Sequence, residues 1–401
     1  MVFTRKVGGR RKARACICGN YEGEVATATN AGGRDASQIR CVVRHAALAK
    51  WSIYGTDIKC AFLNAERADR TKLMTMTIPY AYVKLGVASH QDVWIVGAAM
   101  YGLTSSPRDW SDHRDPVIPT LVWQRDEGNV KWKGSFVKAA DQHLWHLREV
   151  CLETREVHNR GVMTIYVDDV LLAASDEVAA CALRSIAAPW DYADAVRATQ
   201  QETVSFCGFE IQQNGLEHGG GFRLHQRSYE EELINKWEVG RMAGQLDFKL
   251  PSPEEEAEFS RCDDLDLVRR AQACTGALLW LATRTRPELS VGEAAMSGLC
   301  TKAPELAVSI GLKMMVYLKR PTWGIIYADN PGPVHGARQQ LNKPRCVRTV
   351  EAYSDISYAA CLHKGLSFSP RPSLLLCRGS GDVDHQQAAF PYTVNSGERA
   401  C

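Results

Sequence analysis

Three aspartates stand next to runs of residues that favour β-strands. Asp168 and Asp169 interrupt the run Thr-Ile-Tyr-Val-Asp-Asp-Val-Leu-Leu that begins at Thr164, with apolar or β-branched residues on both sides. This pattern predicts a β-hairpin with the acidic pair at its tip. Asp57 ends a shorter apolar run that starts at Trp51, more than a hundred positions earlier. An acidic pair alone would be ordinary turn chemistry, but a third carboxylate at the end of a second predicted strand points to a shared site.

Carboxylates that converge from strand ends suit divalent cations. Mg²⁺ prefers hard oxygen ligands and keeps several of its waters, so a few aspartates are enough to hold it. Nucleotidyl transfer uses two such ions about 3.5 to 4 Å apart, one at the attacking hydroxyl and one at the leaving pyrophosphate. The sequence therefore predicts a site for two Mg²⁺ ions, which Mn²⁺ can replace, with these metal ligands: Asp57, the backbone carbonyl of Ile58, Asp168 and Asp169.

Hydrophobic periodicity predicts the elements that must position these residues. Before the hairpin, a helical period precedes the strand that ends at Asp57, and the charged stretch at 112–160 predicts only short strands and loops. After the hairpin we expect helices at 176–197 and 228–239, the second capped by Ser228, and strands at 203–211 and 221–224. Farther on we expect an acidic linker at 251–256, helices at 265–285, 288–301 and 304–319, a strand at 350–355, and irregular chain beyond about residue 362.

Composition sets broad limits on the class of protein. A chain of 401 residues with 45% hydrophobic residues is long enough for two to three folded domains. The net charge of +2 excludes a uniformly basic nucleic-acid coat, so a polynucleotide would be held by local clusters and bound metal. The fourteen cysteines include no C-x-x-C pair, which favours reduced thiols in an intracellular protein. The histidines show no H-E-x-x-H spacing, and no long apolar run predicts a membrane span or a secretion signal.

Further motifs accompany the aspartates in a fixed order. They are Lys12-Ala-Arg14 with Gly19-Asn20, Asp57-Ile-Lys-Cys-Ala-Phe-Leu-Asn64, Tyr101-Gly-Leu-Thr-Ser-Ser-Pro-Arg-Asp-Trp110, Tyr166-Val-Asp-Asp169, Phe206-Cys-Gly-Phe-Glu-Ile211 with Leu224-His-Gln-Arg-Ser-Tyr229, and Gly276-Ala-Leu-Leu-Trp-Leu-Ala-Thr-Arg-Thr-Arg-Pro287. In this order they resemble the reverse transcriptase of copia-type LTR retrotransposons (Pseudoviridae), a fragment of the Pol polyprotein. The similarity covers about 340 residues.

The resemblance implies an α/β (α+β) right-hand polymerase. The expected parts are a basic tail at 1–9, fingers and palm at 10–215, a thumb and helical connection at 216–320, and an incomplete ribonuclease H-like segment at 345–401. The implied activity is RNA-directed DNA synthesis. The implied partners are an RNA or DNA template with its primer and deoxynucleoside triphosphates, with no membrane, and dimerisation or association with other Pol products is left open. The expected location is the cytoplasm or a virus-like particle, with the nucleus as an alternative.

The resemblance also implies roles for single residues. Asp57, Asp168 and Asp169 would be catalytic, with Asp169 the less direct metal ligand. Nucleotide-binding roles fall on Lys12, Arg14, Ile58, Phe62, Gly102, Tyr166 and Val167. Primer or template contacts fall on Pro107, Arg108, Gly208 and Gln226.

Several of these side chains have a structural alternative. The Phe62 ring would exclude a ribonucleotide by contact with the 2′ carbon of the sugar, or it would simply belong to the core. For Trp110 the core interpretation is favoured, because a Pro-Arg-x-Trp turn packs its ring inward. Arg284 and Arg286 end a predicted helix, where contact with a phosphate and contact with the last carbonyls of the helix are equally good interpretations.

Two departures from the family pattern favour an alternative function. Thr104-Ser105 replaces Lys-Gln of the family motif, and Asp355 begins a ribonuclease H pattern whose further carboxylates do not follow. Ribonuclease H activity needs several carboxylates around two ions, so we expect it to be missing. The main alternative is a decayed, non-catalytic retroelement remnant that keeps the fold and nucleic-acid binding. A phosphotransferase or nuclease with an unrelated fold requires Asp57 and Asp168 to lie far apart.

Overall fold

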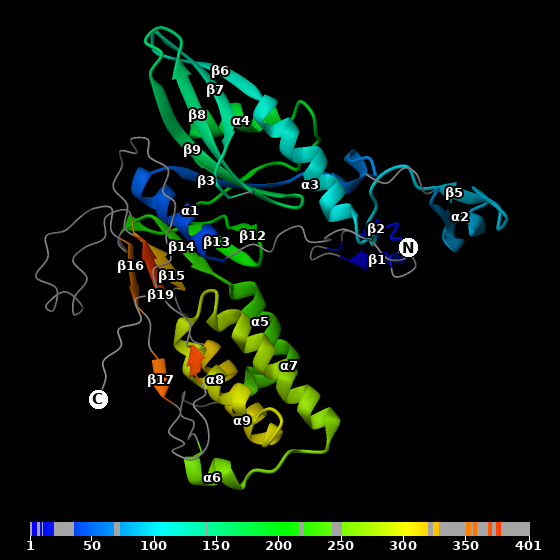
Figure 1. Cartoon of the computed structure of the whole chain (residues 1–401), viewed down its shortest axis with the longest axis vertical. Coiled ribbons are helices and arrows are strands. Elements are labelled where there is room, and N and C mark those ends of the chain that lie inside the picture. Colours follow the sequence, from blue (N-terminus) through cyan, green and yellow to red (C-terminus); the bar gives the residue numbers. More distant parts are fainter. Residues whose placement is uncertain are drawn as a thin grey trace, which may run out of the picture.

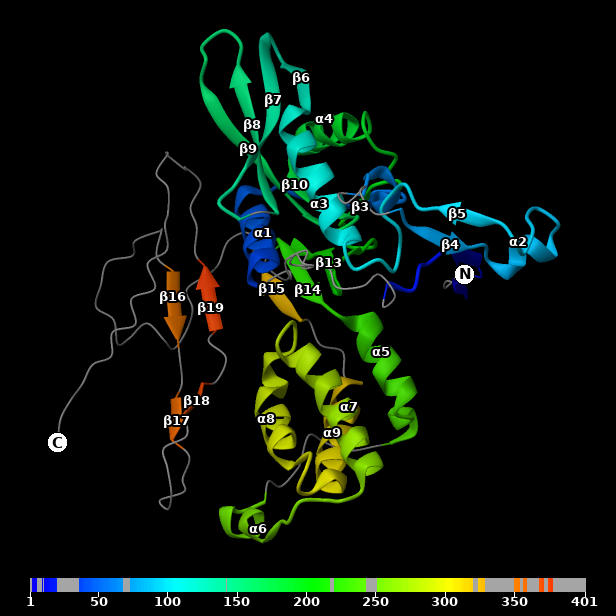
Figure 2. The ribbon, with the colours of Figure 1, turned by 45° about the vertical axis from the view of Figure 1, so that its right-hand side comes forward.

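The chain is a mixed α and β protein, as expected (Figures 1 and 2). The computed structural model describes residues 2–5, 9, 11–19, 36–67, 73–141, 143–216, 220–242, 251–319 and 324–328, together with the backbone of four strands between 350 and 377. The predicted ligand Asp355 lies outside the described residues. Among the described helices, none is long and apolar enough to cross a membrane.

A seven-stranded antiparallel sheet carries the three aspartates. Its strand order is β11-β3-β10-β9-β8-β7-β6. The strands are β3 (Ser52–Asp57), β6 (Val122–Glu127), β7 (Val130–Lys138), β8 (Leu144–Cys151), β9 (Val157–Tyr166), β10 (Asp169–Ala174) and β11 (Val196–Arg197).

The interior strand β10 is covered on both faces. Every position after Asp169 is buried, which explains the unbroken apolar run in the sequence. Val170 and Leu172 pack in one core with α3 (Ser106–Val117) and α4 (Asp176–Ile186). Leu171 and Ala173 pack in a second core with α1 (Ala36–Ala49) on the opposite face.

The strands predicted at 112–160 are confirmed, but most of them are longer than we expected. After α3 and a 3-10 turn (Ile118–Thr120), the chain forms the long strands β6, β7, β8 and the start of β9 (Figure 1). Along β8 buried positions such as Trp145 and Leu147 alternate with half-exposed ones. This period of two is the signal of a strand with one covered face, and the many charges concealed it. The helix predicted at 176–197 is too long, because α4 ends before Pro189.

A four-stranded sheet lies beside the first, in the order β12-β13-β14-β15. Its strands are β12 (Val204–Phe206), β13 (Phe209–Gln213), β14 (Phe222–His225) and β15 (Ile325–Tyr327). The single strand predicted at 203–211 is a hairpin, because Phe206 pairs with Phe209 across a turn at Cys207 and Gly208. Both turn residues have positive φ, 50° and 77°, which gives the backbone its reversal. Phe206, Phe209, Ile211 and Leu224 join the core under α1.

The helices after β14 form a separate lobe with its own core. They are α5 (Arg227–Lys236), α6 (Pro253–Glu258), α7 (Leu265–Ala282), α8 (Ser290–Leu299) and α9 (Pro304–Leu318). The three predicted helices of this region are confirmed. Two details differ. Ser228 lies inside α5 instead of capping it, and the acidic linker contains α6, which Ser252 and Glu255 start with a capping box.

Smaller elements extend the molecule to the right in Figure 1, beyond α3. They are the hairpin β1 (Val2–Arg5) with β2 (Arg11–Arg14), the pair β4 (Thr75–Thr77) and β5 (Val93–Ile95), and α2 (Tyr80–Lys84). The predicted tail at 1–9 therefore contains a strand, because residues 2–5 pair with residues 11–14. Near the C-terminal end β16 (Val350–Tyr353) pairs with β19 (Leu374–Cys377) and β17 (Ile356–Tyr358) pairs with β18 (Phe368–Pro370). The strand predicted at 350–355 is confirmed by β16, whereas β18 and β19 lie where we expected irregular chain.

Candidate metal centre

The acidic hairpin forms as predicted. Tyr166 at the end of β9 pairs with Asp169 at the start of β10, which leaves Val167 and Asp168 as a two-residue turn. Val167 has φ 54°, the left-handed conformation that such a tight turn requires. A side chain of the core fixes this turn, because Nε1 of the buried Trp110 donates a hydrogen bond of 2.5 Å to the Val167 carbonyl. The core interpretation of Trp110 is confirmed, and this residue supports the hairpin that carries the aspartates.

The strand β3 brings the third aspartate to the hairpin. Asp57 is the last residue of β3 and lies opposite Asp169 in the register of β3 with β10. Beyond the strand end, the backbone N–H of Ile58 donates to the carbonyl of Asp168 over 2.8 Å. The Ile58 side chain is a fully buried hydrocarbon, and the backbone carbonyl is the only group of this residue with a ligand atom to offer.

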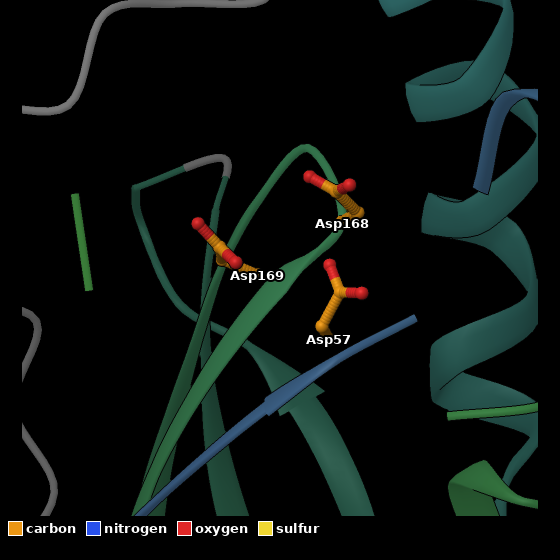
Figure 3. Close-up of side chains that lie close together, drawn as sticks. All are labelled: Asp57, Asp168 and Asp169. Atoms are coloured by element: carbon orange, nitrogen blue, oxygen red, sulfur yellow. The ribbon is translucent and has the colours of Figure 1, made fainter. Parts of the chain in front are cut away.

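The three carboxylates converge. Asp57, Asp168 and Asp169 each offer an oxygen atom, and these atoms all lie within 4.8 Å of one another. In Figure 3 Asp57 and Asp168 lie one above the other, and Asp169 stands beside them on the hairpin. Asp57 is exposed, and the two hairpin aspartates are half-buried. An unrelated fold that keeps Asp57 far from Asp168 is therefore excluded.

Electrostatics at this site favour a cation. The pKa of Asp169 is raised to about 6, first because burial disfavours the charged carboxylate and then because Asp168 and Asp57 add negative charge beside it. A divalent cation between the three groups would relieve this repulsion. The donor set, consisting of carboxylate oxygens, matches the preference of hard divalent cations and not that of a soft metal.

A cluster of two aromatic rings and one guanidinium adjoins the carboxylates. Phe62 belongs to the 3-10 helix Ala61–Asn64 directly after Asp57, and its ring meets Tyr101 edge to face with centroids 5.2 Å apart. The guanidinium of Arg14 lies 4.9 Å from the centroid of the Tyr101 ring. The pKa of Tyr101 is raised, chiefly by burial and next by the charge of Asp168. Tyr101 therefore joins Phe62 and Arg14 to the acidic site, a link that the sequence analysis missed.

The residues predicted to bind the nucleotide differ in burial, and for Lys12 the structure describes only the backbone. Phe62 is half-buried and packs against the core of the large sheet, which bears out the core interpretation of its ring, whereas exclusion of a ribonucleotide stays a prediction. Tyr166 is half-buried in the core under α1. The backbone of Lys12 pairs with Thr4 in β1, while its side chain lies outside the described part of the structure.

Gly102 allows two chain segments to cross. It has φ 96°, and a Cβ atom on it would lie 2.0 Å from the carbonyl oxygen of Ile17. The backbone N–H of Ile17 donates to the Tyr101 carbonyl over 2.8 Å, and a Cβ on Gly19 would in turn strike the Gly102 oxygen. Only glycine fits this close approach, which holds the segment after β2 against the loop that carries Tyr101.

The residues assigned to primer or template contacts occupy different environments. Pro107 stands in the first turn of α3, and Arg108 is exposed beside Asp112, with 3.4 Å between Nε and Oδ2. A Cβ on Gly208 would lie 3.0 Å from the Trp280 ring. Gln226 is buried and accepts a hydrogen bond of 2.9 Å from Thr285, so any effect on a primer would act through the segment it holds.

The two arginines after α7 differ in accessibility. Arg286 is buried and forms ion pairs of 2.6 Å with Glu230 and with Glu288, so it cannot reach a phosphate in this conformation. Arg284 is half-buried, and its guanidinium lies 3.5 Å from the centroid of the exposed Trp280 ring. Trp280 was not recognised as a site residue, although a tryptophan four positions before an arginine at a helix end could have signalled such a pair.

Comparison with known proteins adds no identification, because no protein-family model, curated protein or solved structure matches the chain.

Proposed function

We propose that the chain is an RNA-directed DNA polymerase of the LTR-retrotransposon type, adding deoxynucleotides to a primer 3′-end. One observation carries the proposal. Asp57 at the end of β3 and Asp168 and Asp169 in the β9–β10 hairpin, more than a hundred residues later, place carboxylate oxygens within 4.8 Å of one another. The ordered motifs around them, from Lys12 to Pro287, are those that resemble copia-type reverse transcriptases.

The parts of the molecule correspond to the parts of a right-hand polymerase in this proposal. The two sheets with α1, α3 and α4 would be the palm, and α5 with α7 to α9 would be the thumb and connection. The hairpin β1–β2 and the pair β4–β5 would belong to the fingers.

Each residue of the site has a task in the proposed reaction. Two Mg²⁺ ions, when bound, would activate the primer hydroxyl and neutralise the leaving pyrophosphate. Asp57 and Asp168 would hold them, and Asp169 would act as the outer ligand. Arg14 would attract the triphosphate, since a guanidinium matches phosphate oxygens. Phe62, supported by Tyr101, would lie against the sugar. Phosphate contacts would dominate affinity for the template, which should fall as salt rises.

Primer extension tests the proposal. The full chain is incubated with an oligo-dT-primed RNA template, deoxynucleotides, and Mg²⁺ or Mn²⁺, beside the variants Asp168→Asn and Asp112→Asn. We expect extension by the parent and by Asp112→Asn, whose aspartate is exposed on α3. Asp168→Asn should lose about a thousandfold in rate, since removing a ligand costs several kcal/mol of transition-state stabilisation. Extension that persists in Asp168→Asn would refute the role of the hairpin.

A non-catalytic remnant that still binds nucleic acid is the second candidate. The observation that favours it is Thr104-Ser105, which stands before α3 where the family has Lys-Gln. The Ser105 hydroxyl donates to Asp109 over 3.1 Å at the start of this helix. At this position the chain therefore has a short side chain that bonds within the helix, where the family has a long amide side chain. This candidate predicts salt-sensitive binding of a primed template and no extension with either ion.

A further inference from the structure

The four residues that follow α7, Thr283 to Arg286, form a junction between the helical lobe and the two sheets. We call residues 283–286 the junction segment. Its backbone or side chains bond to three other parts of the described structure: α1, the β12–β13 turn, and α5 with the residue before it. A short segment with so many bonded partners fixes the angle between the elements that it joins.

Arg40 supplies the bond from α1. Its Nη2 donates to the carbonyl of Thr283 over 2.7 Å and to the carbonyl of Arg284 over 2.6 Å. Carbonyls at the end of a helix need partners from outside the helix, and a cation there also complements the helix dipole. Contact of Arg284 or Arg286 with these carbonyls was one of the two interpretations that the sequence left open. The structure shows instead that an arginine from a helix on the face of the large sheet does so.

Arg284 connects the junction segment to the turn between β12 and β13. Its Nη1 donates to the Cys207 carbonyl over 3.3 Å, in the turn between β12 and β13. Its guanidinium covers the Trp280 ring at 3.5 Å and lies 5.1 Å from the centroid of Phe209. Tyr166, the last residue of β9 before the acidic turn, packs against the core that contains Phe209. The junction segment therefore contacts the core from which the acidic hairpin extends.

The remaining bonds attach the junction segment to α5. The Thr285 hydroxyl donates to Gln226 over 2.9 Å, and Arg286 pairs with Glu230 at 2.6 Å. All four side chains are buried, which makes these bonds costly to break. The buried bonds to Gln226 and Glu230 and the bonds from Arg40 together fix the position of the end of α7 relative to the sheets.

We infer that Arg40 is a positioning residue. By holding the carbonyl end of α7, it sets where the Trp280–Arg284 pair stands relative to Asp57, Asp168 and Asp169. This inference rests on the proposed function, in which a primer–template duplex must contact the helical lobe and the carboxylates together. The exposed indole, with 39% of its surface accessible, and the cation on its face are suited to contact the bases and phosphates of such a duplex.

Binding and extension measurements test the inference on the full chain. The variants are Arg40→Ala, Arg40→Lys and the control Arg44→Ala. Arg44 is a matched control, because it lies one turn farther along α1 and also donates to a backbone carbonyl, that of Ala328, outside the junction segment. A fluorescently labelled DNA–RNA primer–template is titrated by anisotropy, KM values for duplex and for deoxynucleotide are measured, and the thermal midpoint is recorded.

Arg40→Ala should weaken duplex affinity about tenfold, the size expected for loss of one or two charge-assisted hydrogen bonds. The KM for the deoxynucleotide should stay unchanged, because Arg14, Tyr101 and the aspartates lie on elements that Arg40 does not bond. Arg40→Lys should recover most of the affinity, since its ammonium can donate to one of the two carbonyls. Arg44→Ala should bind duplex as the parent does.

An equal loss of affinity in Arg44→Ala, or a loss in Arg40→Ala that follows a lowered thermal midpoint, would reduce Arg40 to a general stabilising residue and overturn the inference. Unchanged affinity in Arg40→Ala, or a parent that binds no duplex, would overturn it as well. A parent that binds duplex but extends no primer would refute the proposed function alone. In that case the anisotropy comparison of Arg40→Ala with Arg44→Ala still decides the role of Arg40.

Discussion

Two groups of acidic side chains in the seven-stranded sheet have opposite electrostatic surroundings. Glu149 on β8 is fully buried and accepts hydrogen bonds from Trp123 at 2.9 Å and from Arg125 at 2.7 Å. The hydrogen bond with Glu149 is the main reason that the pKa of Arg125 is raised, so this carboxylate favours the charged guanidinium. At the hairpin, by contrast, Asp168 and Asp57 both act to raise the pKa of Asp169.

The difference shows which buried or half-buried acid is structural. The fold itself supplies the opposite charge for Glu149, and the resulting pair completes the packing of β6, β7 and β8. At the hairpin the fold instead gathers like charges, which costs stability unless a cation binds. Burial and residue type alone do not separate the two groups, because the sign of the neighbouring charges carries the distinction.

Removal of Glu149 should produce the largest effect on stability. Glu149→Ala leaves the indole N–H of the buried Trp123 without its acceptor and leaves Arg125, whose side chain is 10% exposed, with the half-exposed Glu127 as its ion-pair partner. Losing one partner of a buried ion pair costs about 3–5 kcal/mol. Urea denaturation followed by circular dichroism measures the free energy of unfolding. Glu127→Ala is the control, because Glu127 also contacts Arg125 but is half-exposed and should cost less than about 1 kcal/mol. Equal losses of unfolding free energy in Glu149→Ala and Glu127→Ala would show that Glu149 has no special structural role, and the contrast with the hairpin aspartates would disappear.

Divalent cations should stabilise the protein through the hairpin group. At a Mg²⁺ concentration about a hundred times the Kd, binding to the folded state alone adds about 2.7 kcal/mol, which raises the thermal midpoint by a few degrees. Thermal melts with MgCl₂ and with NaCl at matched ionic strength separate binding from screening. Asp168→Asn should lose most of the shift and Glu149→Gln should keep it. The same shift in both variants would show that the ions bind elsewhere.

The ring beside the hairpin should affect the choice of sugar. Phe62→Ala should raise the use of a ribonucleotide relative to a deoxynucleotide about tenfold, equivalent to about 1.4 kcal/mol, because the ring no longer occupies the space beside the 2′ carbon. The ratio of kcat/KM values in single-nucleotide extension measures the effect. Leu63→Ala, in the same 3-10 helix and exposed, is the control. An unchanged ratio would assign Phe62 to the core alone.

A third acid, Glu210, should give the smallest effect, visible in the pH dependence of stability. Burial alone would raise its pKa, but hydrogen bonds from His225 and from the Ser228 N–H together lower it. A carboxyl with a lowered folded pKa contributes stability above its unfolded pKa, near 4.5, and loses that contribution as the pH falls through the folded value. Glu210→Gln should therefore have a shallower loss of unfolding free energy below pH 4.5. Identical slopes of unfolding free energy against pH in the parent and in Glu210→Gln would contradict the lowered pKa of Glu210.

The sequence predicted the acidic hairpin because its signal is local. Apolar runs on both sides of Asp168 and Asp169 are enough to place a turn, and the run from Trp51 is enough to end a strand at Asp57. The register that sets Asp57 opposite Asp169, and the contact of Tyr101 with Phe62, depend on long-range pairing that no local pattern encodes.

The errors have physical causes of the same kind. Along β6 to β8 the charged positions hid a period of two, and one long strand was assigned where Cys207 and Gly208 reverse the chain. Arg40 carried no signal, because an arginine on a helix face is ordinary until its partner carbonyls are known. The aspartates were thus found from the sequence, while the residues that hold the surrounding elements in place were not.

The register between β3 and β10 has a consequence for the order of folding. The β9–β10 hairpin closes over a two-residue turn, a fast local event, whereas β3 must return to it across more than a hundred residues. The three carboxylates therefore come together only when this slow long-range pairing is complete. A luminescent lanthanide such as Tb³⁺, added during refolding, should bind in step with the docking of β3 and would time the last stage of assembly.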